Sequence, residues 1–599
     1  MIKSYQCDFE TTLESPTRVW LWASCDIDNI EDVRYEWDLD SFFEWCMKET
    51  KVLYYQNLRF DGEFIIHWLL SNDFKFRSTD LPGDEQFGET KKVKLHDNEF
   101  TAIISDDGKY YYIKVMFKEG KKPKYVEIYD GLKKIPFSVK DIAKTFKLDI
   151  KKGELDYSKH LYYKEHPEEA LTYIKNDVQI PAQGLKIQLD KGLRKMTIGA
   201  DALNSYKGTV GNKFRQLFPL LSEQEDEFVR HSYKGGFCWV NPKYQGKTMG
   251  KGYVYDNNSM YPSRMRYCPM PIGYGIYGIG EYKKDVVYDL YVQHFKATFK
   301  IKLNHIPTIQ IKNNRYFREN EYVSECNETT EFWLTSVDFK LFKEQYDIEE
   351  IEYIDYYKYR SVLGAFNKYI DYWGEVKANS KGGLRTLAKL MLNNLYGKFS
   401  TNKIVKGKYP YLKEDGSVGY NLLEERTRQT VYIPVGSFIT AYGRDLCIRT
   451  AQACYNEKPI VEIDYNVEHD IAYCDTDSVH CLGTGEPNID IHESRLGAWK
   501  LENTFIKSRY LRQKTYLERL EQSIDNYDEE ELTWYQKWLL RHGFYDDIKC
   551  CGMPQNVKNK LSEYDPFGVF YQGLEVGGKL MPTHVPGGIL LKDTTFTIK

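Results

Sequence analysis

The sequence lacks the patterns that mark several large classes of protein. Its 12 cysteines form no Cys-x₂-Cys pair and its histidines form no His-x₃-His pair, so no zinc site is predicted. Cys550 and Cys551 are adjacent and are not expected to form a disulfide. No apolar run approaches the ~18–20 residues needed to cross a bilayer, and the first residues hold no apolar signal segment. We therefore expect a cytoplasmic protein with reduced cysteines.

The chain also lacks the overall basic charge that is usual in a simple nucleic-acid-binding protein. Its 599 residues carry a formal net charge of −4, and they leave room for several domains. Basic residues nevertheless outnumber acidic ones from Lys118 to Lys152 and from Asp355 to Lys408. Neutralising a phosphate backbone needs such local charge, and the 50 tyrosines offer rings on which bases could stack.

Two aspartate motifs lie far apart in the chain, and each follows a short β-prone run. They are Asp-Asn-Asn-Ser-Met-Tyr-Pro-Ser at 256–263 and Tyr-Cys-Asp-Thr-Asp-Ser at 473–478. An isolated Asp-x-Asp is most often a solvated turn, but the β-prone residues on both sides of the second motif predict a hairpin with acids at its tip. If the strand ends converge, Asp256 and Asp477 could hold two Mg²⁺ ions for in-line phosphoryl transfer.

A third block, at 381–397, predicts a helix with one cationic and one apolar face. The polar face holds residues spaced four apart: Lys381, Arg385, Lys389 and Asn393. The apolar face holds Leu384, Leu387, Met391 and Leu395. Alone, such a face is most often simply solvated, but a nucleoside triphosphate needs cationic groups of this kind.

The amino-terminal region carries a separate set of acids. Asp8 and Glu10 alternate on a β-prone run and should share one face of a strand. Asp61 follows a second strand and turn, and Tyr173 and Asp177 share a face of a helix that begins after Pro167. Each acid alone is most often a surface residue. Together they fit a two-metal phosphodiester hydrolase in which Tyr173 orients the attacking water.

The first three blocks resemble motifs of the family B DNA polymerases. Their residues are similar to those of the protein-primed branch found in small Bacillus phages. The resemblance is carried by Asn-Ser-x-Tyr-Pro, Lys-Leu-Met-Leu-Asn-x-Leu-Tyr-Gly-Lys-Phe and Tyr-Cys-Asp-Thr-Asp-Ser. It implies that Asp256 and Asp477 are metal ligands, that Asp475 supports their site, and that Tyr261 discriminates against the ribose 2′-hydroxyl. Met260 stands where this branch usually has leucine, and the departure preserves size.

The same resemblance implies further contacts to nucleotide and DNA. Expected nucleotide ligands are Lys389 and Asn393, with Lys377 and Arg385 on the triphosphate and Tyr396 near the nascent base pair. Arg385 replaces a usual lysine and preserves the charge. Expected DNA contacts are Lys514 and Tyr516 at the primer terminus, and Tyr233, Gly235 and Gly236 of a Tyr-x-Gly-Gly stretch that coordinates DNA between two active sites.

The amino-terminal acids resemble the three exonuclease motifs of DnaQ-type 3′–5′ proofreading domains. This implies metal ligation by Asp8, Glu10 and Asp177 and catalytic roles for Asp61, Tyr173 and Lys152. Expected contacts to the single-stranded 3′ end are Thr11, Asn57, Phe60, Leu132 and Tyr157. Gln56 replaces a usual histidine and Gly131 a usual serine, so primer-end binding should be weaker.

The predicted fold is multidomain, α/β and α+β, with an RNase H-like exonuclease domain followed by a right-hand polymerase with two insertions. The expected parts are an exonuclease domain (1–197), a palm (198–267 and 433–550), a first inserted domain (268–364), fingers (365–401), a second insertion (402–432) and a thumb (551–599). The resemblance to the protein-primed branch implies that the first insertion contacts the priming protein and the duplex. The second holds an Asp-Gly hairpin signal at 415–416 and should close a tunnel around the template.

The sequence therefore predicts a processive, strand-displacing, DNA-directed DNA polymerase with 3′–5′ exonuclease, primed by a terminal protein. It should use two Mg²⁺ per active site, with Mn²⁺ able to substitute, and act on DNA and dNTPs as a monomer in the cytoplasm, that of the host for a phage protein. Alternatives are a conventionally primed family B polymerase, or an inactive DNA-binding protein of the replication complex, which would require a missing carboxylate. An insertion at Pro459–Asp470 and an acidic stretch at Leu520–Asp547 carry no functional prediction.

Overall fold

The computed structural model describes residues 2–78, 94–311, 321–457, 468–485, 487–527, 529 and 532–599. Most of the expected insertion at Pro459–Asp470 lies outside these residues, as do Asp528, Glu530 and Glu531 of the acidic stretch. Within the described ranges, no helix is long and apolar enough to cross a membrane. All 12 cysteines are free thiols, including the adjacent Cys550 and Cys551.

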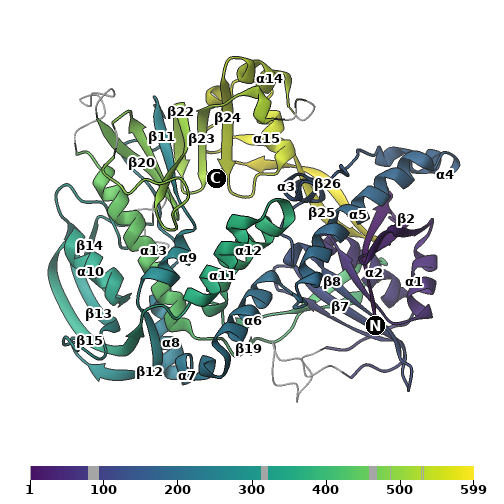
Figure 1. The fold of residues 1–599 in the computed structure, drawn as a ribbon. Coiled ribbons are helices and arrows are strands. Elements are labelled where there is room, and N and C mark those ends of the chain that lie inside the picture. The colour runs from purple at the N-terminus through teal and green to yellow at the C-terminus, as the bar shows by residue number, and fades with distance from the viewer. Residues whose placement is uncertain are drawn as a thin grey trace. The chain divides into compact units, whose positions relative to one another are not determined.

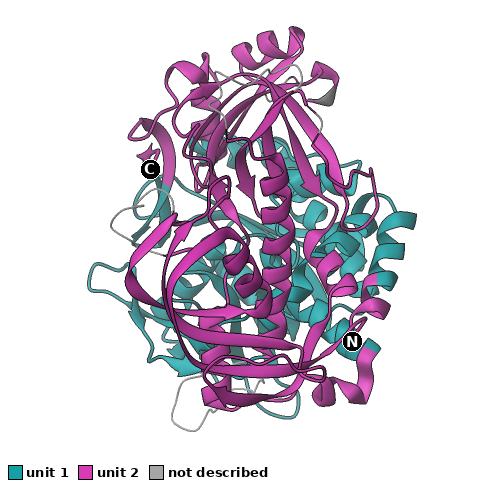
Figure 2. Cartoon of the chain, turned by 90° about the vertical axis from the view of Figure 1, so that its left-hand side faces the viewer, with its two compact units in different colours: residues 1–209, 371–430, 581–592 teal, residues 210–370, 431–580, 593–599 magenta. Residues whose placement is uncertain are grey.

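The chain divides into two compact units, which are coloured separately in Figure 2. Unit 1 comprises residues 1–209, 371–430 and 581–592. Unit 2 comprises residues 210–370, 431–580 and 593–599. Each unit therefore combines segments that are far apart in the sequence.

Unit 1 is built on an eight-stranded sheet with the order β3-β2-β1-β4-β8-β7-β6-β5. Figure 1 labels β2, β7 and β8 of this sheet. Its strands are β1 (Lys3–Thr11), β2 (Val19–Asp26), β3 (Asn29–Glu36), β4 (Lys51–Tyr55), β5 (Lys75–Phe76), β6 (Glu99–Ile104), β7 (Tyr110–Lys118) and β8 (Lys124–Asp130). β1 pairs in parallel with β4, and β4 with β8. The carboxyl ends of these three strands therefore meet at one edge of the sheet.

Helices cover both faces of this sheet. The helices of unit 1 are α1 (Leu39–Lys48), α2 (Leu58–Ser71), α3 (Val139–Phe146), α4 (His160–Glu165), α5 (Glu168–Asp190), α6 (Ile198–Val210), α11 (Asn367–Asn379) and α12 (Gly382–Phe399), with short 3₁₀ turns η1 (Gly131–Lys133) and η2 (Tyr157–Lys159). Residues 210 and 367–370 of these helices belong to unit 2. α1 and α2 contribute to one apolar core, and α3 and α5 to the other.

Local sequence explains where the key elements of unit 1 begin. α5 follows Pro167 as predicted, with Glu168 and Glu169 in its first turn, where the helix dipole favours acids. The Asp-Gly signal forms the predicted hairpin, and Gly416 takes a positive φ of 80° in its turn. The hairpin strands are β17 (Lys408–Leu412) and β18 (Val418–Leu422), flanked by β16 (Ile404–Val405) and β19 (Arg426–Thr427).

Unit 2 contains a second large sheet, ordered β24-β23-β22-β11-β21-β20-β9, with β10 paired to β22. Its strands are β9 (Cys238–Val240), β10 (Thr248–Met249), β11 (Gly252–Asn257), β20 (His469–Asp475), β21 (Ser478–Gly483), β22 (Trp499–Arg512), β23 (Thr515–Glu521) and β24 (Phe544–Cys550). α13 (Ile433–Cys454) packs on one face, where Cys447, Ile448 and Ala451 join the core.

A smaller four-stranded sheet, ordered β12-β15-β13-β14, accounts for the strand-like region after residue 268. It comprises β12 (Met270–Ile279), β13 (Leu290–Ile301), β14 (Glu325–Thr335) and β15 (Tyr346–Val362), with α10 (Ser336–Gln345) packed in its core. The remaining helices of unit 2 are α7 (Phe214–Leu217), α8 (Glu223–Ser232), α9 (Met260–Tyr267), α14 (Trp534–Arg541) and α15 (Gln555–Leu561), with 3₁₀ turns η3 (Gly211–Lys213), η5 (Ile524–Asn526) and η7 (Pro566–Gly568). A last hairpin pairs β25 (Glu575–Val585) with β26 (Gly588–Thr597), and its tip, 581–592, belongs to unit 1.

Gly252 at the start of β11 tests the packing of the large sheet of unit 2. A Cβ atom there would overlap the carbonyl oxygen of Cys481 and the ring of Phe505. We expect Gly252→Ala to lower the free energy of unfolding by about 1–3 kcal/mol, the cost of overpacking a core. The matched control is Gly250→Ala, because nothing lies within 4 Å of a Cβ at Gly250. Equal midpoints of thermal unfolding for the two variants would contradict this packing.

Candidate active sites

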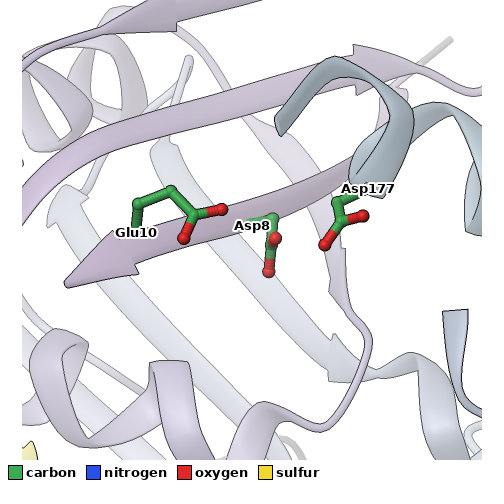
Figure 3. A group of neighbouring side chains, drawn as sticks. All are labelled: Asp8, Glu10 and Asp177. Atoms are coloured by element: carbon green, nitrogen blue, oxygen red, sulfur yellow. The ribbon is translucent and has the colours of Figure 1, made fainter. Parts of the chain in front are cut away.

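Three carboxylates of unit 1 converge as the sequence predicts. Asp8 and Glu10 project from the same face of β1, and Asp177 projects from α5 toward them (Figure 3). A set of ligand oxygens, one from each residue, lies within 4.8 Å of one another. Oxygen ligands at such spacing suit a hard divalent cation.

The carboxylates of this cluster disfavour one another's charge. Burial, together with the charge of Asp177, raises the pKa of Asp8 to about 7. Burial and the charge of Asp8 likewise raise the pKa values of Glu10 and Asp61 well above their ordinary range. Burial raises the pKa of Asp177, although the Lys152 ammonium opposes the shift. A bound cation would relieve both the burial and the repulsion.

Unpaired oxygens in the same cluster also fit a cation. Oδ1 of Asp61 and Oδ1 of Asp177 are buried and have no hydrogen-bond partner among the described residues. Buried acceptors left unsatisfied are costly, and a metal ion or its bound water would satisfy them. The donor set of unit 1 therefore fits divalent metal ions.

Lys152, Tyr173 and Tyr157 lie beside the cluster, as the sequence predicts. Nζ of Lys152 lies 2.5 Å from Oδ2 of Asp177 and 5.2 Å from the centroid of the Tyr173 ring. Burial alone would lower the pKa of Lys152, but the Asp177 carboxylate reverses the direction and raises it. The hydroxyls of Tyr173 and Tyr157 lie 2.9 Å apart. Both tyrosines therefore border the carboxylates from the α5 side.

The expected strand contacts of unit 1 gather at the carboxyl edge of its sheet, where Asp130 joins two of them. Oδ1 of Asp130 accepts hydrogen bonds from the backbone N–H groups of Asn57 and Leu58 at 3.2 Å and of Leu132 at 3.0 Å. Asn57 takes a positive φ of 77° at the start of α2. Sequence reasoning missed Asp130, although an aspartate that ends a β-prone run was a usable signal.

Gln56 and Gly131, the two departures from the exonuclease motifs, lie next to each other. Nε2 of Gln56 donates to the carbonyls of Ile135 at 3.0 Å and Phe137 at 2.7 Å. A Cβ at Gly131 would lie 2.8 Å from Oε1 of Gln56. Gln56 therefore holds the segment after η1, and a side chain at 131 would require the Gln56 amide to shift. Weaker primer-end binding remains a prediction.

The other expected strand contacts lie on neighbouring elements. Thr11 ends β1 and is 7% exposed. Phe60 lies in the first turn of α2 and is half-buried, with its ring centroid 5.6 Å from that of Phe64. Thr11 thus offers a base or sugar little surface, and Phe60 offers more.

The two aspartate motifs of unit 2 lie side by side in the large sheet. β20 and β21 form the predicted hairpin, and Thr476 at its tip has a positive φ of 63°. β11 pairs with β21 so that Asp256 lies opposite Ser478. The backbone N–H of Asn257 also donates to the carbonyl of Asp477 at 2.7 Å. The predicted convergence of Asp256 with Asp477 is confirmed for their backbones.

Asp475 and Asp477 have different surroundings. Nζ of Lys514 lies 2.7 Å from Oδ1 of Asp475, and the Tyr473 hydroxyl donates to Oδ2 of Asp475 at 3.2 Å. Asp475 is thus held by protein groups. Burial raises the pKa of Asp477, and the charge of Asp475 adds to the shift. Binding a cation would again relieve that cost.

Glycine is required where the Tyr-x-Gly-Gly stretch meets the hairpin. The backbone N–H of Thr476 donates to the carbonyl of Phe237 at 2.7 Å. This approach places Thr476 Cγ2 and Oγ1 2.6 Å from where a Cβ of Gly236 would lie. Gly235 is exposed, and Tyr233 follows the end of α8. Gly236 therefore lies beside the Asp475–Asp477 turn.

Tyr261 and Tyr516 are held by packing. Tyr261 is half-buried in α9, and Gly443 of α13 lies so close that a Cβ there would be 2.9 Å from the tyrosine ring. Tyr516 is 9% exposed, and its ring centroid lies 5.0 Å from that of Tyr473. The half-buried Tyr261 can therefore present a fixed edge to a ligand, whereas the buried Tyr516 ring offers little surface.

The predicted cationic face of 381–397 is present on α12 in unit 1. Arg385, Lys389 and Asn393 are exposed, whereas Leu387, Met391 and Leu395 are buried. Lys381 is the N-cap residue, and Leu384 is only partly buried. Arg385 donates to the carbonyl of Lys377 in α11 at 2.8 Å. Tyr396 is partly buried on the same helix.

Known DNA polymerases are similar to this chain over most or all of its length. A family model described as DNA polymerase type B, organellar and viral, matches residues 44–495. The DNA polymerase of Bacillus phage phi29 is 41% identical, covering 100% of this chain and 99% of that protein. The DNA polymerase of Streptococcus phage Cp-1 is 30% identical, covering 99% of this chain and 98% of that protein.

Solved structures agree with these relatives. Phi29 DNA polymerase complexed with primer-template DNA and incoming nucleotide substrates superimposes with a TM-score of 0.86 at 40% identity, covering 100% of both chains. Its complex with single-stranded DNA gives a TM-score of 0.86 at 39% identity, again over 100% of both chains. The predicted resemblance to family B polymerases of Bacillus phages is confirmed, and the chain belongs to the type B DNA polymerases of organelles and viruses.

Proposed function

We propose that the protein is a DNA-directed DNA polymerase that is primed by the hydroxyl of a terminal protein and carries its own 3′–5′ exonuclease. The observation that carries the polymerase assignment is the junction of β11 with β21, where Asn257 donates to the carbonyl of Asp477 in a chain of the type B family. The inactive alternative would require the loss of a carboxylate from the motifs, and all of these carboxylates are present.

In the proposed polymerase centre, Asp256 and Asp477 are the ligands of two Mg²⁺ ions, with Mn²⁺ able to substitute. These ions would stabilise the attacking and leaving oxygens of an in-line displacement. Lys514 holds Asp475 by an ion pair of 2.7 Å, so that Asp475 supports the turn. Lys514 and Tyr516 bind the primer terminus. We assign Tyr261 to exclusion of the ribose 2′-hydroxyl, because close packing against Gly443 holds its ring in place.

The exposed face of α12 is proposed to bind the triphosphate of the incoming nucleotide. Lys389 and Asn393 would contact it directly, with Arg385 and Lys377 adding charge. Cationic groups are needed where negative charge develops during phosphoryl transfer. Tyr396 is proposed to lie near the nascent base pair.

The proposed exonuclease centre is the cluster of unit 1. Asp8, Glu10 and Asp177 would hold two divalent ions, and Asp61 adds a further carboxylate. Tyr173 orients the attacking water, and Lys152 stabilises the charge that forms on the phosphate. Thr11, Asn57, Phe60, Leu132 and Tyr157 would bind the single-stranded 3′ end, while Tyr233, Gly235 and Gly236 would guide it between the two centres.

The proposed domains follow the predicted boundaries. They are an RNase H-like exonuclease domain (1–197), a palm (198–267 and 433–550), fingers (365–401) and a thumb (551–599), with insertions at 268–364 and 402–432. The grouping of 371–430 and 581–592 with the first residues of the chain supports an association of fingers, second insertion and thumb tip with the exonuclease domain.

The first insertion is proposed to contact the terminal protein and the duplex. Its exposed apolar side chains, Tyr274 at 64% and Ile279 at 82%, support a surface for a partner. Conventional priming is the alternative, since an available surface does not identify its partner. We propose that the enzyme acts as a monomer in the cytoplasm of the host, where free cysteines stay reduced.

The second insertion and the thumb tip support a closed passage for the template. The Tyr420 hydroxyl of β18 donates to Oε2 of Glu63 in α2 at 2.7 Å, and Nδ1 of His584 lies 3.3 Å from the same oxygen. Val418 and Ile589 join the core that contains α2. A passage closed by these contacts would hinder dissociation and admit only one strand.

Removing a metal ligand of unit 2 separates the two proposed activities. Asp256→Ala or Asp477→Ala should abolish nucleotide addition, because each leaves a cation without a carboxylate. Degradation of single strands should continue, since Asp8 and Asp177 are untouched. The measurement is primer extension beside release of labelled nucleotides. Extension above a few per cent of the parent rate in both variants would contradict the metal assignment.

The opposite separation is expected in unit 1. Asp8→Ala combined with Glu10→Ala should remove exonuclease activity and spare extension of a matched primer, because two ligands of the cluster are lost. Degradation and extension are measured as above, and circular dichroism checks the fold. Surviving degradation in the double variant would place the hydrolytic site elsewhere.

Deleting the second insertion tests the closed passage. Replacing Lys406–Gln429 by a short Gly/Ser linker should leave addition of a single nucleotide nearly intact, because no proposed metal or triphosphate ligand lies there. Products on a primed circle in the presence of trap DNA should become much shorter, and synthesis through a blocking strand should fall. The matched variant Tyr420→Phe loses the hydrogen bonds of the Tyr420 hydroxyl to Glu63 and Tyr110 and should give an intermediate effect. Many rounds of copying by the deletion variant would disprove the passage.

A further inference from the structure

A buried histidine–glutamate pair crosses the large sheet of unit 2. His480 on β21 and Glu518 on β23 are each 2% exposed, and Nδ1 of His480 lies 2.7 Å from Oε1 of Glu518. This contact is a hydrogen bond between the imidazole and the carboxylate. β11 and β22 lie between the two strands in the sheet. The contact therefore ties together strands that are not neighbours.

On one side, this pair reaches the turn that carries Asp475 and Asp477. Nε2 of His480 lies 3.2 Å from Oγ of Ser478, the residue directly after Asp477. The Ser478 hydroxyl in turn lies 3.4 Å from the carbonyl of Asp475. A shift of the imidazole would thus move Ser478 and the end of the proposed metal-binding turn.

On the other side, the pair reaches the β22–β23 hairpin that carries Lys514 and Tyr516. The His480 ring packs edge-on against the ring of Tyr516, with centroids 5.2 Å apart. Tyr510 donates from its hydroxyl to Oε1 of Glu518 at 2.5 Å. Both strands of that hairpin are therefore bound to the pair.

Tyr473 completes the connection. Its ring lies edge-on to His480 with centroids 5.1 Å apart. Its hydroxyl accepts the backbone N–H of Lys514 at 2.9 Å and donates to Oδ2 of Asp475 at 3.2 Å. One polar network thus spans the turn and the hairpin.

Stability alone does not account for such a network. Taking a carboxylate and an imidazole out of water is costly, and a buried pair is weak support for the folded state. What a fully satisfied buried network does provide is a single geometry. The groups at its two ends are the proposed metal ligands and the proposed primer contacts.

We propose that His480 and Glu518 are positioning residues of the polymerase centre. They hold the Asp475–Asp477 turn at a fixed distance from Lys514 and Tyr516, so that the primer 3′-hydroxyl meets the metal-bearing carboxylates. This inference rests on the proposed roles of Asp477, Lys514 and Tyr516. The parent protein and Asp477→Ala are therefore measured first, because a failure there concerns the proposed function and not the pair.

The principal variant is His480→Phe, which keeps a ring and removes both nitrogen contacts. We expect kcat for nucleotide addition to fall by about 10- to 100-fold, since a misplacement of about 1 Å costs up to about 100-fold. KM for dNTP should change little, because the proposed triphosphate ligands lie on α11 and α12. Glu518→Met should have the same effect, and the double variant should lose no more than either single variant.

Two further readouts separate positioning from a structural role. Without metal, in EDTA, affinity for a primer-template should fall severalfold, while affinity for a single strand stays the same. With metal, degradation of a paired primer should rise relative to degradation of a single strand, because the terminus is held less well at the polymerase centre. Loss of global stability would lower both degradation rates together.

Two control variants complete the test. Glu518→Gln keeps the acceptor oxygen and should retain most of the parent kcat. Leu520→Ala removes volume from the core cluster that contains Tyr473, Tyr510 and Tyr516 without removing a hydrogen bond of the network. It should lower the melting temperature but leave the ratio of paired to single-strand degradation unchanged. If His480→Phe does not fold, Glu518→Met and Glu518→Gln carry the same comparison. The proposal is overturned if kcat is unchanged, or if the pair variants behave like Leu520→Ala in every readout.

Discussion

The repulsion between acids that the fold buries close together is the constraint on which the rest of this molecule depends. Burial and the charge of Asp177 raise the pKa of Asp8 to about 7, and burial raises the pKa of Asp477. These arrangements are costly without cations and favourable with them. The carboxylates whose burial is costly are therefore the same groups that would bind divalent cations.

Both sheets meet this constraint by fixing acids through the backbone. In unit 1, parallel pairing aligns the ends of β1, β4 and β8, and Asp130 binds three backbone N–H groups there. In unit 2, Asn257 donates to Asp477, and Gly236 allows Thr476 to approach. Asp8, Glu10 and Asp256 lie on strands and Asp177 lies on a helix, and sites on such elements are more precise than sites on loops.

Local patterns of the sequence predicted much of this arrangement, and non-local contacts explain what they missed. Alternation placed Asp8 with Glu10, helical spacing placed Tyr173 with Asp177, and Asp-Gly predicted the β17–β18 hairpin. Asp130 was missed because its role depends on β8 lying beside β4, and the pair of His480 with Glu518 because two other strands separate them. In the sequence, Gln56 and Gly131 are two separate departures, each of which removes an expected strand contact. In the structure, the Gln56 side chain lies next to Gly131. The ligand roles of the site residues remain predictions.

One measurement tests directly whether the two centres work on the same strand. A primer whose mismatched 3′-terminal nucleotide carries the label is annealed to a template and incubated with dNTPs and Mg²⁺. We expect the label to appear as free mononucleotide before full-length product accumulates, because the exonuclease centre removes the mismatch and the polymerase centre then extends the corrected end. Full-length product that retains the label, with no free nucleotide, would contradict the assignment of a proofreading centre to Asp8, Glu10 and Asp177.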